Sequence, residues 1–196
     1  MSNVVFSISM SLDGFMTASN QTSEEPLGEG GQRLHEWAFD DEDHRSHDVL
    51  TRALSSEGAV IAGRRTYDHS VPWWGADGPN DADRTPLFVV SHDVPENIPE
   101  GGVYTFVDGI EAALVLAKEA AGDKDVSVMG GADIGRQYIK AGLVDEIWIH
   151  LVPVLFGSGT QMFEEMGSEH VPLETVEVIE GTLATHLHFR VLDRPS

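Results

Sequence analysis

The stretch Asp125-Val126-Ser127-Val128-Met129-Gly130-Gly131-Ala132 decides the fold of this chain. A short strand-like run leads into two glycines, and the segment after them has the spacing of a helix over residues 132–140, ended by Gly142. The wholly apolar run at residues 58–63 ends in a glycine in the same way. Strands of this kind that alternate with helices indicate a parallel sheet covered by helices on both faces.

The rest of the chain continues this alternation and then departs from it. Further strands are expected at residues 4–12, 86–91 and 103–107, and further helices at residues 43–55 and 110–121. The last three expected strands have no helix between them and favour antiparallel pairing; they are residues 146–154, 173–180 and 185–191. Two long polar segments, residues 17–33 and 68–85, are expected to be loops. We predict one domain over residues 1–196, a three-layer α/β/α fold with a mostly parallel sheet and antiparallel carboxyl-terminal strands.

The charge of the chain disfavours nucleic acid and membrane surfaces as partners. It carries 33 Asp and Glu against 12 Lys and Arg, a formal net charge of −21. Such a surface repels nucleic-acid backbones and anionic lipids, so we expect neither nucleic acid nor membrane as a partner. The same field opposes anionic cofactors wherever Arg, Ser and backbone N–H groups do not overcome it locally.

Cysteine is absent, which excludes disulfides, thiolate catalysis and cysteine-ligated zinc. The amino terminus lacks the pattern of a secretory signal, and no stretch approaches the roughly 18 apolar residues of a membrane span. We therefore expect a cytoplasmic protein. Two histidine pairs, His44 with His47 and His186 with His188, each share one face of an expected element. Neither pair has a clear third ligand, so no metal site is expected.

Three expected strand ends carry residues suited to a phosphate. Gly63-Arg64-Arg65-Thr66 offers a close backbone approach and guanidinium groups. Ser91-His92 offers a hydroxyl and an imidazole, and Gly130-Gly131 precedes a helix whose N–H groups and dipole attract anions. Each end also has a plainer explanation: two exposed arginines, a strand-end cap and an ordinary strand–helix turn. Because carboxyl ends of neighbouring parallel strands share one edge, together they predict a dinucleotide groove.

Four motifs in this order resemble one reductase family over nearly the whole chain. They are Ser11-Leu12-Asp13-Gly14, Gly63-Arg64-Arg65-Thr66, Gly130-Gly131-Ala132, and Asp145-Glu146-Ile147 at the start of a segment that continues through Pro153-Val154-Leu155-Phe156-Gly157-Ser158-Gly159. The chain is similar to the carboxyl-terminal domain of the bacterial riboflavin-biosynthesis deaminase/reductase, the RibD C-terminal type, which is a relative of dihydrofolate reductase. The resemblance implies a dihydrofolate-reductase-like fold and an NADPH-dependent oxidoreductase.

The resemblance also implies which residues hold NADPH. Gly63, Arg64 and Thr66 would contact the cofactor phosphates, and Ser91 would face the adenosine 2′-phosphate end. The full set of expected cofactor-binding residues is Gly63, Arg64, Arg65, Thr66, Ser91, His92, Gly130, Gly131, Ala132, Asp133 and Ile134. His92 is a departure, because relatives often carry a more basic residue there, whereas Arg64 and Arg65 favour NADPH.

Asp13 is the leading candidate for a proton donor, because it follows a buried strand and a desolvated carboxyl has a raised pKa. An Asp-Gly turn explains it equally well, and Glu36 or Asp41 is an alternative acid. For the substrate, Trp73 and Trp74 either stack on a flat heterocycle or pack over the sheet edge. Phe156 and Gly157 are the other substrate candidates.

The leading hypothesis is an NADPH-dependent reductase that transfers a hydride to a pterin-like or aminopyrimidine-like heterocycle. One alternative is the 5-amino-6-(5-phosphoribosylamino)uracil reductase of riboflavin biosynthesis, which needs a second basic cluster for its ribose phosphate. The other is a non-catalytic nucleotide-binding protein. The expected partners are a small-molecule heterocyclic substrate and a second copy of the chain, which would form a homodimer.

Overall fold

The structure is a computed structural model that describes residues 2–22, 24–80 and 82–192. The chain divides into two units. The first comprises Met1–Val5 and Leu54–Leu143, and the second comprises Phe6–Ala53 and Val144–Ser196. Strand β1 (Val4–Ser11) contributes residues to both units.

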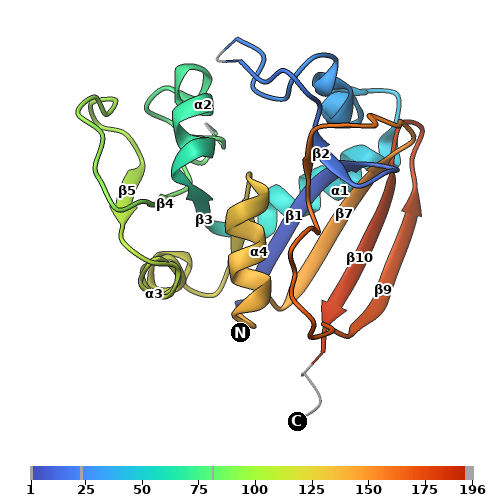
Figure 1. The fold of residues 1–196 in the computed structure, drawn as a ribbon. Helices are drawn as coiled ribbons and strands as arrows, with labels where there is room; N and C mark the ends of the chain where they lie inside the picture. The colour runs from blue at the N-terminus through green and yellow to red at the C-terminus, as the bar shows by residue number, and fades with distance from the viewer. Residues whose placement is uncertain (1, 23, 81, 193–196) are drawn as a thin grey trace. The chain divides into compact units, whose positions relative to one another are not determined.

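The first unit is built on parallel strands. They lie in the order β5-β4-β3-β6, with bounds β3 Glu57–Gly63, β4 Leu87–Val90, β5 Tyr104–Val107 and β6 Asp125–Met129. The register places Val60 opposite both Leu87 and Ser127. Each strand is short and largely apolar, as a sheet covered on both faces requires. The helices of this unit are α2 Arg64–Trp74, α3 Ile110–Ala121 and α4 Ala132–Lys140, and α2 and α4 each follow directly from a strand end (Figure 1).

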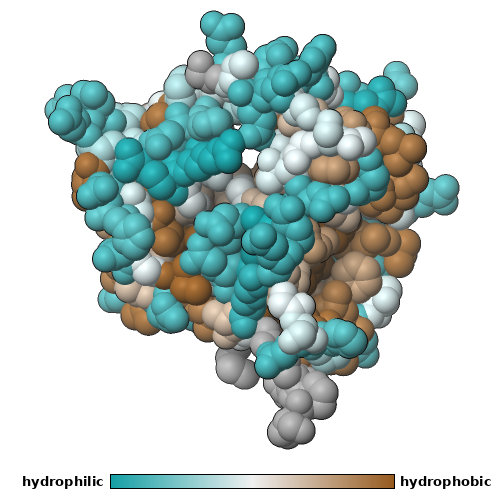
Figure 2. All heavy atoms as spheres, viewed as in Figure 1, coloured by the Kyte–Doolittle hydropathy of each residue, from teal (hydrophilic) through white to brown (hydrophobic). Residues whose placement is uncertain are grey.

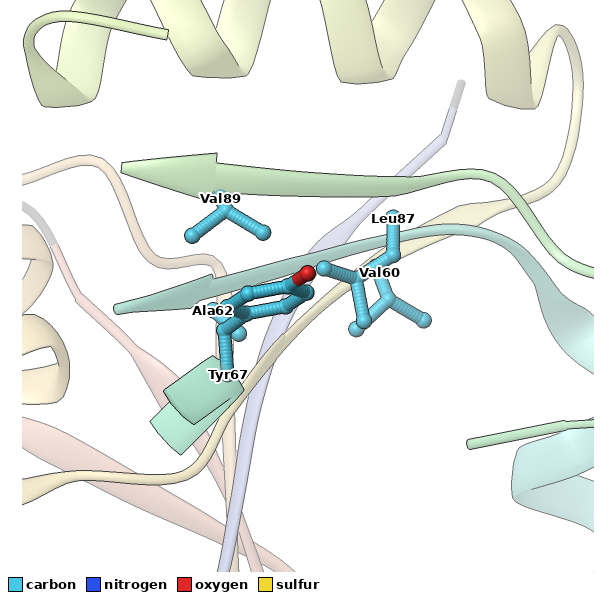
Figure 3. Close-up of a cluster of buried hydrophobic side chains, with 5 residues drawn as sticks. All are labelled: Val60, Ala62, Tyr67, Leu87 and Val89. Carbon is cyan, nitrogen blue, oxygen red and sulfur yellow. The ribbon is translucent and has the colours of Figure 1, made fainter. Parts of the chain in front are cut away.

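A tyrosine from α2 fills the core beside β3 and β4. Figure 3 shows the Tyr67 ring lying against side chains of both strands, and the cluster comprises Val60, Ala62, Tyr67, Leu87 and Val89. The ring of Tyr67 meets those of Tyr104 and Phe106 edge-on, each at a centroid distance of 5.0 Å. This edge-to-face geometry is the favourable one for aromatic pairs. The cluster fixes α2 on the sheet and therefore fixes the residues at its first turn.

The second unit holds the antiparallel strands. They lie in the order β7-β10-β9, with bounds β7 Glu146–Val152, β9 Leu173–Glu180 and β10 Thr185–Val191. Leu187 of β10 pairs with Ile149 of β7, and the β9–β10 register shifts between His188 and Phe189. A small second sheet pairs β2 (Phe15–Thr17) with β8 (Thr160–Gln161). The 3₁₀ helix η1 (Gly31–Phe39) packs Leu34 and Trp37 against Val152.

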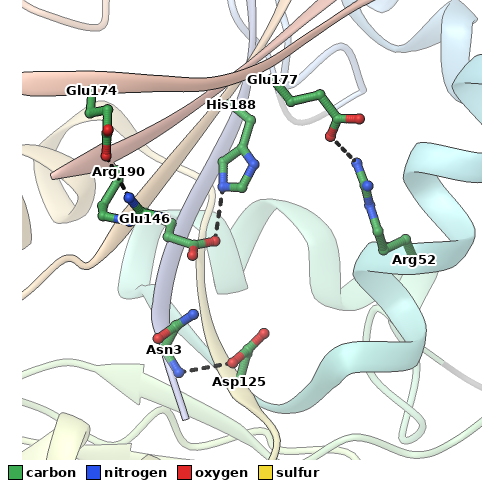
Figure 4. A network of polar contacts seen from close by, with 8 residues as sticks. All are labelled: Asn3, Arg52, Asp125, Glu146, Glu174, Glu177, His188 and Arg190. Atoms are coloured by element: carbon green, nitrogen blue, oxygen red, sulfur yellow. Dashed lines mark hydrogen bonds and ion pairs between the residues drawn. The ribbon is translucent and has the colours of Figure 1, made fainter. Parts of the chain in front are cut away.

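Helix α1 (His44–Ser56) contacts β9 and β10 through its side chains. Figure 4 shows Arg52 of α1 reaching Glu177 of β9, at 2.8 Å, and His188 of β10 bonding to Glu146. On β9, Val176 and Val178 are exposed, and Figure 2 shows apolar residues among hydrophilic ones where Figure 1 draws β9 and β10. No helix of the described residues is long and apolar enough to cross a membrane.

The expected fold class is confirmed, with one clear error in its elements. Residues 68–85 were expected to be a loop, but α2 extends to Trp74 and ends at Gly75, whose N–H donates to the carbonyl of Val71 at 3.0 Å. Pro72 lies inside the helix and has no N–H to donate to the preceding turn, and the helix ends two residues later at Trp74. Both Trp73 and Trp74 are therefore helical. The sequence also gave no sign of η1, β2 or β8.

Candidate active site

The carboxyl ends of β3 and β6 bring two glycine turns to one edge of the first unit. The two strands are parallel neighbours, and Ala62 pairs with Met129. Gly63 therefore enters α2 beside the point where Gly130 and Gly131 enter α4. A Cβ on Gly63 would lie 3.6 Å from Cβ of the buried Ile134. The structure thus brings together two of the three strand ends that the sequence singled out.

Thr66 joins these two turns. Its Oγ1 accepts a hydrogen bond of 3.0 Å from the N–H of Gly131. Gly130 has a φ of 84°, and a Cβ there would lie 2.4 Å from Oγ1 of Thr66. Only glycine fits this position, because a side chain would be both strained and in collision with α2. We call the turn residues Gly63, Thr66, Gly130 and Gly131, with the first turns of α2 and α4, the cradle.

The cradle presents two helix N-termini without side-chain caps. Gly63 and Gly131 are the N-cap residues of α2 and α4, and neither makes a side-chain cap hydrogen bond. The N–H groups of a first helical turn have no partner within the helix, and with the helix dipole they attract anions. Ala132 is buried at the start of α4, while Asp133 is exposed and accepts a hydrogen bond from Gln137. The geometry fits a phosphate-bearing cofactor.

Arg64 connects the cradle to the third strand end. Its Nη1 donates to Oγ of Ser91 at 3.3 Å and to the carbonyl of Asp93 at 3.0 Å. Its Nε donates to the carboxylate of Asp68 one turn along α2, at 2.8 Å. The structure therefore brings Arg64 and Ser91 together. His92 instead pairs with Asp108 at 2.7 Å, where both side chains are exposed, and Arg65 is exposed on α2.

The two tryptophans of α2 have different surroundings. Trp74 is half-buried and packs against the Tyr67 cluster, which agrees with the packing alternative. Trp73 is 60% exposed. Trp73 therefore remains the candidate for stacking on a flat ring.

Asp13 is an ionised anchor of the second unit, and its pKa is the reverse of the expectation. Ser11 donates to its Oδ1 at 2.7 Å, and the N–H groups of Phe156 and Gly157 donate at 3.1 and 2.7 Å. The hydrogen bond from Ser11, with those two N–H groups, holds the pKa of Asp13 below its ordinary value. The lowered pKa contradicts the raised pKa that was expected, while the role of Asp13 as a proton donor stays a prediction. Phe156 and Gly157 serve here as partners that fix the Asp-Gly turn.

Three histidines, His150, His186 and His188, have hydrogen-bond partners within the protein. His188 bonds to Glu146, and His186 bonds to Ser46 and to His150. Within residues 2–22, 24–80 and 82–192, no three His, Asp or Glu side chains gather where they would hold a metal ion. His150 was not singled out from the sequence, although it lies two residues from Trp148 on one strand face.

Solved structures with the same architecture define the class of fold. A putative riboflavin biosynthesis protein from Shewanella sp. PV-4 superposes with a TM-score of 0.71 at 22% identity, covering 98% of this chain and 100% of that one. Dihydrofolate reductase from Enterococcus faecalis, complexed with NADP(H) and RAB-propyl, gives 0.61 at 15% identity, covering 97% of each chain. A Thermotoga maritima diaminohydroxyphosphoribosylaminopyrimidine deaminase/5-amino-6-(5-phosphoribosylamino)uracil reductase gives 0.65 at 13% identity, covering 97% of this chain and 57% of that one. This is a dihydrofolate-reductase-like fold.

The family follows from the sequence itself. The profile of the RibD C-terminal domain matches residues 2–186, so the chain belongs to that family. The uncharacterized protein YwjB of Bacillus subtilis (strain 168) is 27% identical over 117 residues, 56% of this chain. That match spans 60% of the length of the Bacillus protein, less than two thirds of it.

Proposed function

We propose that this chain is an NADPH-dependent reductase of an aminopyrimidine-like or pterin-like heterocycle, of the kind that riboflavin biosynthesis uses. Membership of the RibD C-terminal domain family supports a reductase. The printed name of the Thermotoga protein includes an aminouracil reductase, and the Enterococcus enzyme was solved with NADP(H). A cytoplasmic location and a homodimer remain predictions.

The single observation that carries the proposal is the cradle. Two uncapped helix N-termini meet where Thr66 accepts from Gly131, and Gly130 keeps the space beside them free of a side chain. Its N–H groups would hold the pyrophosphate, and Arg64 with Ser91 would lie towards the adenosine end. When bound, the nicotinamide supplies the hydride, and the protein's part is to bind, orient and exclude water.

Two glycine variants test whether the cradle binds the cofactor. Gly130→Ala adds a Cβ 2.4 Å from Thr66, whereas Gly142→Ala adds one with no atom within 4 Å. Both glycines have positive φ, 84° and 68°, so the backbone strain is matched and the obstruction differs. We expect Gly130→Ala to weaken NADPH binding at least about tenfold, a loss of ~1.4 kcal/mol, with Gly142→Ala close to wild type.

The assay is calorimetric titration with NADPH and with NADH, followed by loss of NADPH absorbance with pterins, folates and phosphoribosyl pyrimidines. Absence of binding by the wild-type chain would refute the proposal. Equal binding by the two glycine variants would remove the cradle as the cofactor site. Binding without turnover of any heterocycle would favour the non-catalytic alternative.

A further inference from the structure

A continuous line of hydrogen bonds runs through the interior of the second unit. Asp43 Oδ2 lies 2.7 Å from Ser46 Oγ, and Ser46 Oγ lies 2.8 Å from Nε2 of His186. Nδ1 of His186 lies 2.8 Å from Nδ1 of His150, and Nε2 of His150 lies 3.0 Å from Oγ of Ser7. We call these five residues the histidine chain. They come from β1, β7, β10 and the start of α1, four segments that are distant in the sequence.

The carboxylate of Asp43 sets the direction of every bond in the chain. Burial acts to raise the pKa of Asp43, but hydrogen bonds from Ser46 and from the N–H of Thr182 outweigh it and hold that pKa below its ordinary value. An ionised carboxylate only accepts, so the Ser46 hydroxyl donates to it. His186 must then donate from Nε2 to Ser46, and its Nδ1 must accept from His150. The remaining nitrogen of His150, Nε2, accepts from the Ser7 hydroxyl.

The histidine chain is largely buried, and other residues pack closely over it. His186 and Ser46 are 0% exposed, and His150 is 7% exposed. The Trp37 ring of η1 lies against both imidazoles, with centroids 4.3 Å from His150 and 4.9 Å from His186. A Cβ on Gly181 would lie 2.5 Å from Oγ of Ser46, so the turn between β9 and β10 also approaches without a gap. The chain therefore holds η1 and the start of α1 onto β7 and β10.

The charged groups around the histidine chain would do little to stabilise a positive charge on either imidazole. The titratable and charged groups on the elements packed against it are Arg33, His35 and Glu36 of η1; Asp43 before α1, and His44, Arg45, His47, Asp48 and Arg52 in it; Glu146 of β7; His188 and Arg190 of β10; and Glu174, Glu177 and Glu180 of β9. Glu146 bonds to His188, and Glu177 bonds to Arg52 (Figure 4). Arg45 donates to the backbone carbonyl of Glu180. Asp43 is separated from His186 by the Ser46 hydroxyl.

We propose that the histidine chain is an acid-sensitive latch, which releases η1 and the start of α1 when the His150–His186 pair takes up a proton. Each ring nitrogen of the pair already has a partner, two as donors and two as acceptors. A further proton either sets two N–H groups against each other across 2.8 Å or reverses the Ser7 hydroxyl. In both cases it places a positive charge in the interior beside Trp37. The latch does not depend on the proposed reductase activity.

The titration of the two rings agrees with this geometry. Burial, with the neighbouring His186 and His35, lowers the pKa of His150 to about 3, and burial lowers the pKa of His186. A histidine exposed by opening has a pKa of about 6.5, so the open form binds more protons than the closed form below that pH. Below about pH 6.5, each fall of one pH unit therefore raises the equilibrium constant for opening about tenfold for each ring that is neutral in the closed form.

Two measurements on the polypeptide of residues 1–196 test the latch. The first is nitrogen-15 NMR of the histidine side chains at neutral pH, where we expect His150 to carry its proton on Nδ1 and His186 on Nε2. A proton found on Nε2 of His150 would overturn the proposed direction of the hydrogen bonds in the histidine chain. This readout uses the wild-type protein and needs no variant to fold.

The second measurement is hydrogen exchange between about pH 6.5 and about pH 4.5, corrected for the intrinsic exchange rates. We expect residues 31–50 to open at least about tenfold more per pH unit, while the α3 helix of the first unit keeps its protection. His186→Gln removes one titrating ring and should flatten this response, and His47→Gln, an exposed histidine of α1, should leave it unchanged. Parallel loss of protection in residues 31–50 and in α3, or an unchanged slope in His186→Gln, would overturn the latch.

Discussion

Replacing Tyr67 with Phe is expected to stabilise the protein. The ring of Tyr67 is 1% exposed within the first unit, and its hydroxyl is buried with no hydrogen-bond partner among the described residues. A buried polar group without a partner costs roughly 1–3 kcal/mol, while the ring contacts to Tyr104 and Phe106 are the same for Phe. We expect Tyr67→Phe to raise the free energy of unfolding by about 1 kcal/mol, or the melting temperature by about 2–4 °C for a chain of this size.

Tyr104→Phe is the matched control. The Tyr104 hydroxyl donates to the carbonyl of Gly75 at 2.6 Å, so the same chemical change removes a formed bond and should cost about 0.5–1.5 kcal/mol. Urea unfolding followed by circular dichroism measures both variants under one set of conditions. If Tyr67→Phe destabilised the chain as much as Tyr104→Phe, the Tyr67 hydroxyl would have a partner in solution, and the reasoning from burial would fail.

Three further changes test other contacts. Thr66→Val keeps the shape of the side chain but removes the acceptor for the Gly131 N–H, and should lower the free energy of unfolding by about 0.5–1.5 kcal/mol in urea. Asp13→Asn should lower the melting temperature at neutral pH but not below the lowered pKa of Asp13, because the stabilisation is complete above the ordinary carboxyl pKa and is lost as the pH falls through the lowered one. An unchanged acid limb of the pH–rate profile would show that Asp13 is no proton donor. Gly181→Ala places a Cβ 2.5 Å from Oγ of Ser46 and should cost about 1–3 kcal/mol by thermal melting, and a neutral result would show that the turn can shift.

Much of the fold was predictable because glycines mark the ends of its elements. The helices over residues 110–121 and 132–140 have the expected bounds, and each is followed by a glycine with positive φ, Gly122 and Gly142. Residues 68–74 were misjudged because polar residues and Pro72 weaken the local pattern. Their helix is stabilised instead by Tyr67, whose partners lie on other strands. Propensity alone does not register such packing.

The candidate site was also predictable only in part. The glycine turns and Arg64 were found because each lies at a recognisable strand end, and parallel strands share an edge. The pKa of Asp13 was misjudged because the N–H groups that lower it come from Phe156 and Gly157, far along the chain. The histidine chain was missed because its two histidines lie far apart in the sequence. They are brought together only by the register of β7 and β10, in which His186 pairs with His150.

The contacts of Arg64 have a consequence for the effect of salt on the proposed cofactor site. Its guanidinium already bonds to Asp68, so its charge is partly compensated before any anion arrives, and the chain as a whole carries −21. Mobile ions weaken the long-range repulsion between such a chain and a dinucleotide beyond a screening length of about 8 Å at physiological ionic strength, yet leave short hydrogen bonds nearly intact. At the proposed cofactor site, the affinity for NADPH is therefore expected to rise as salt is added at moderate concentrations.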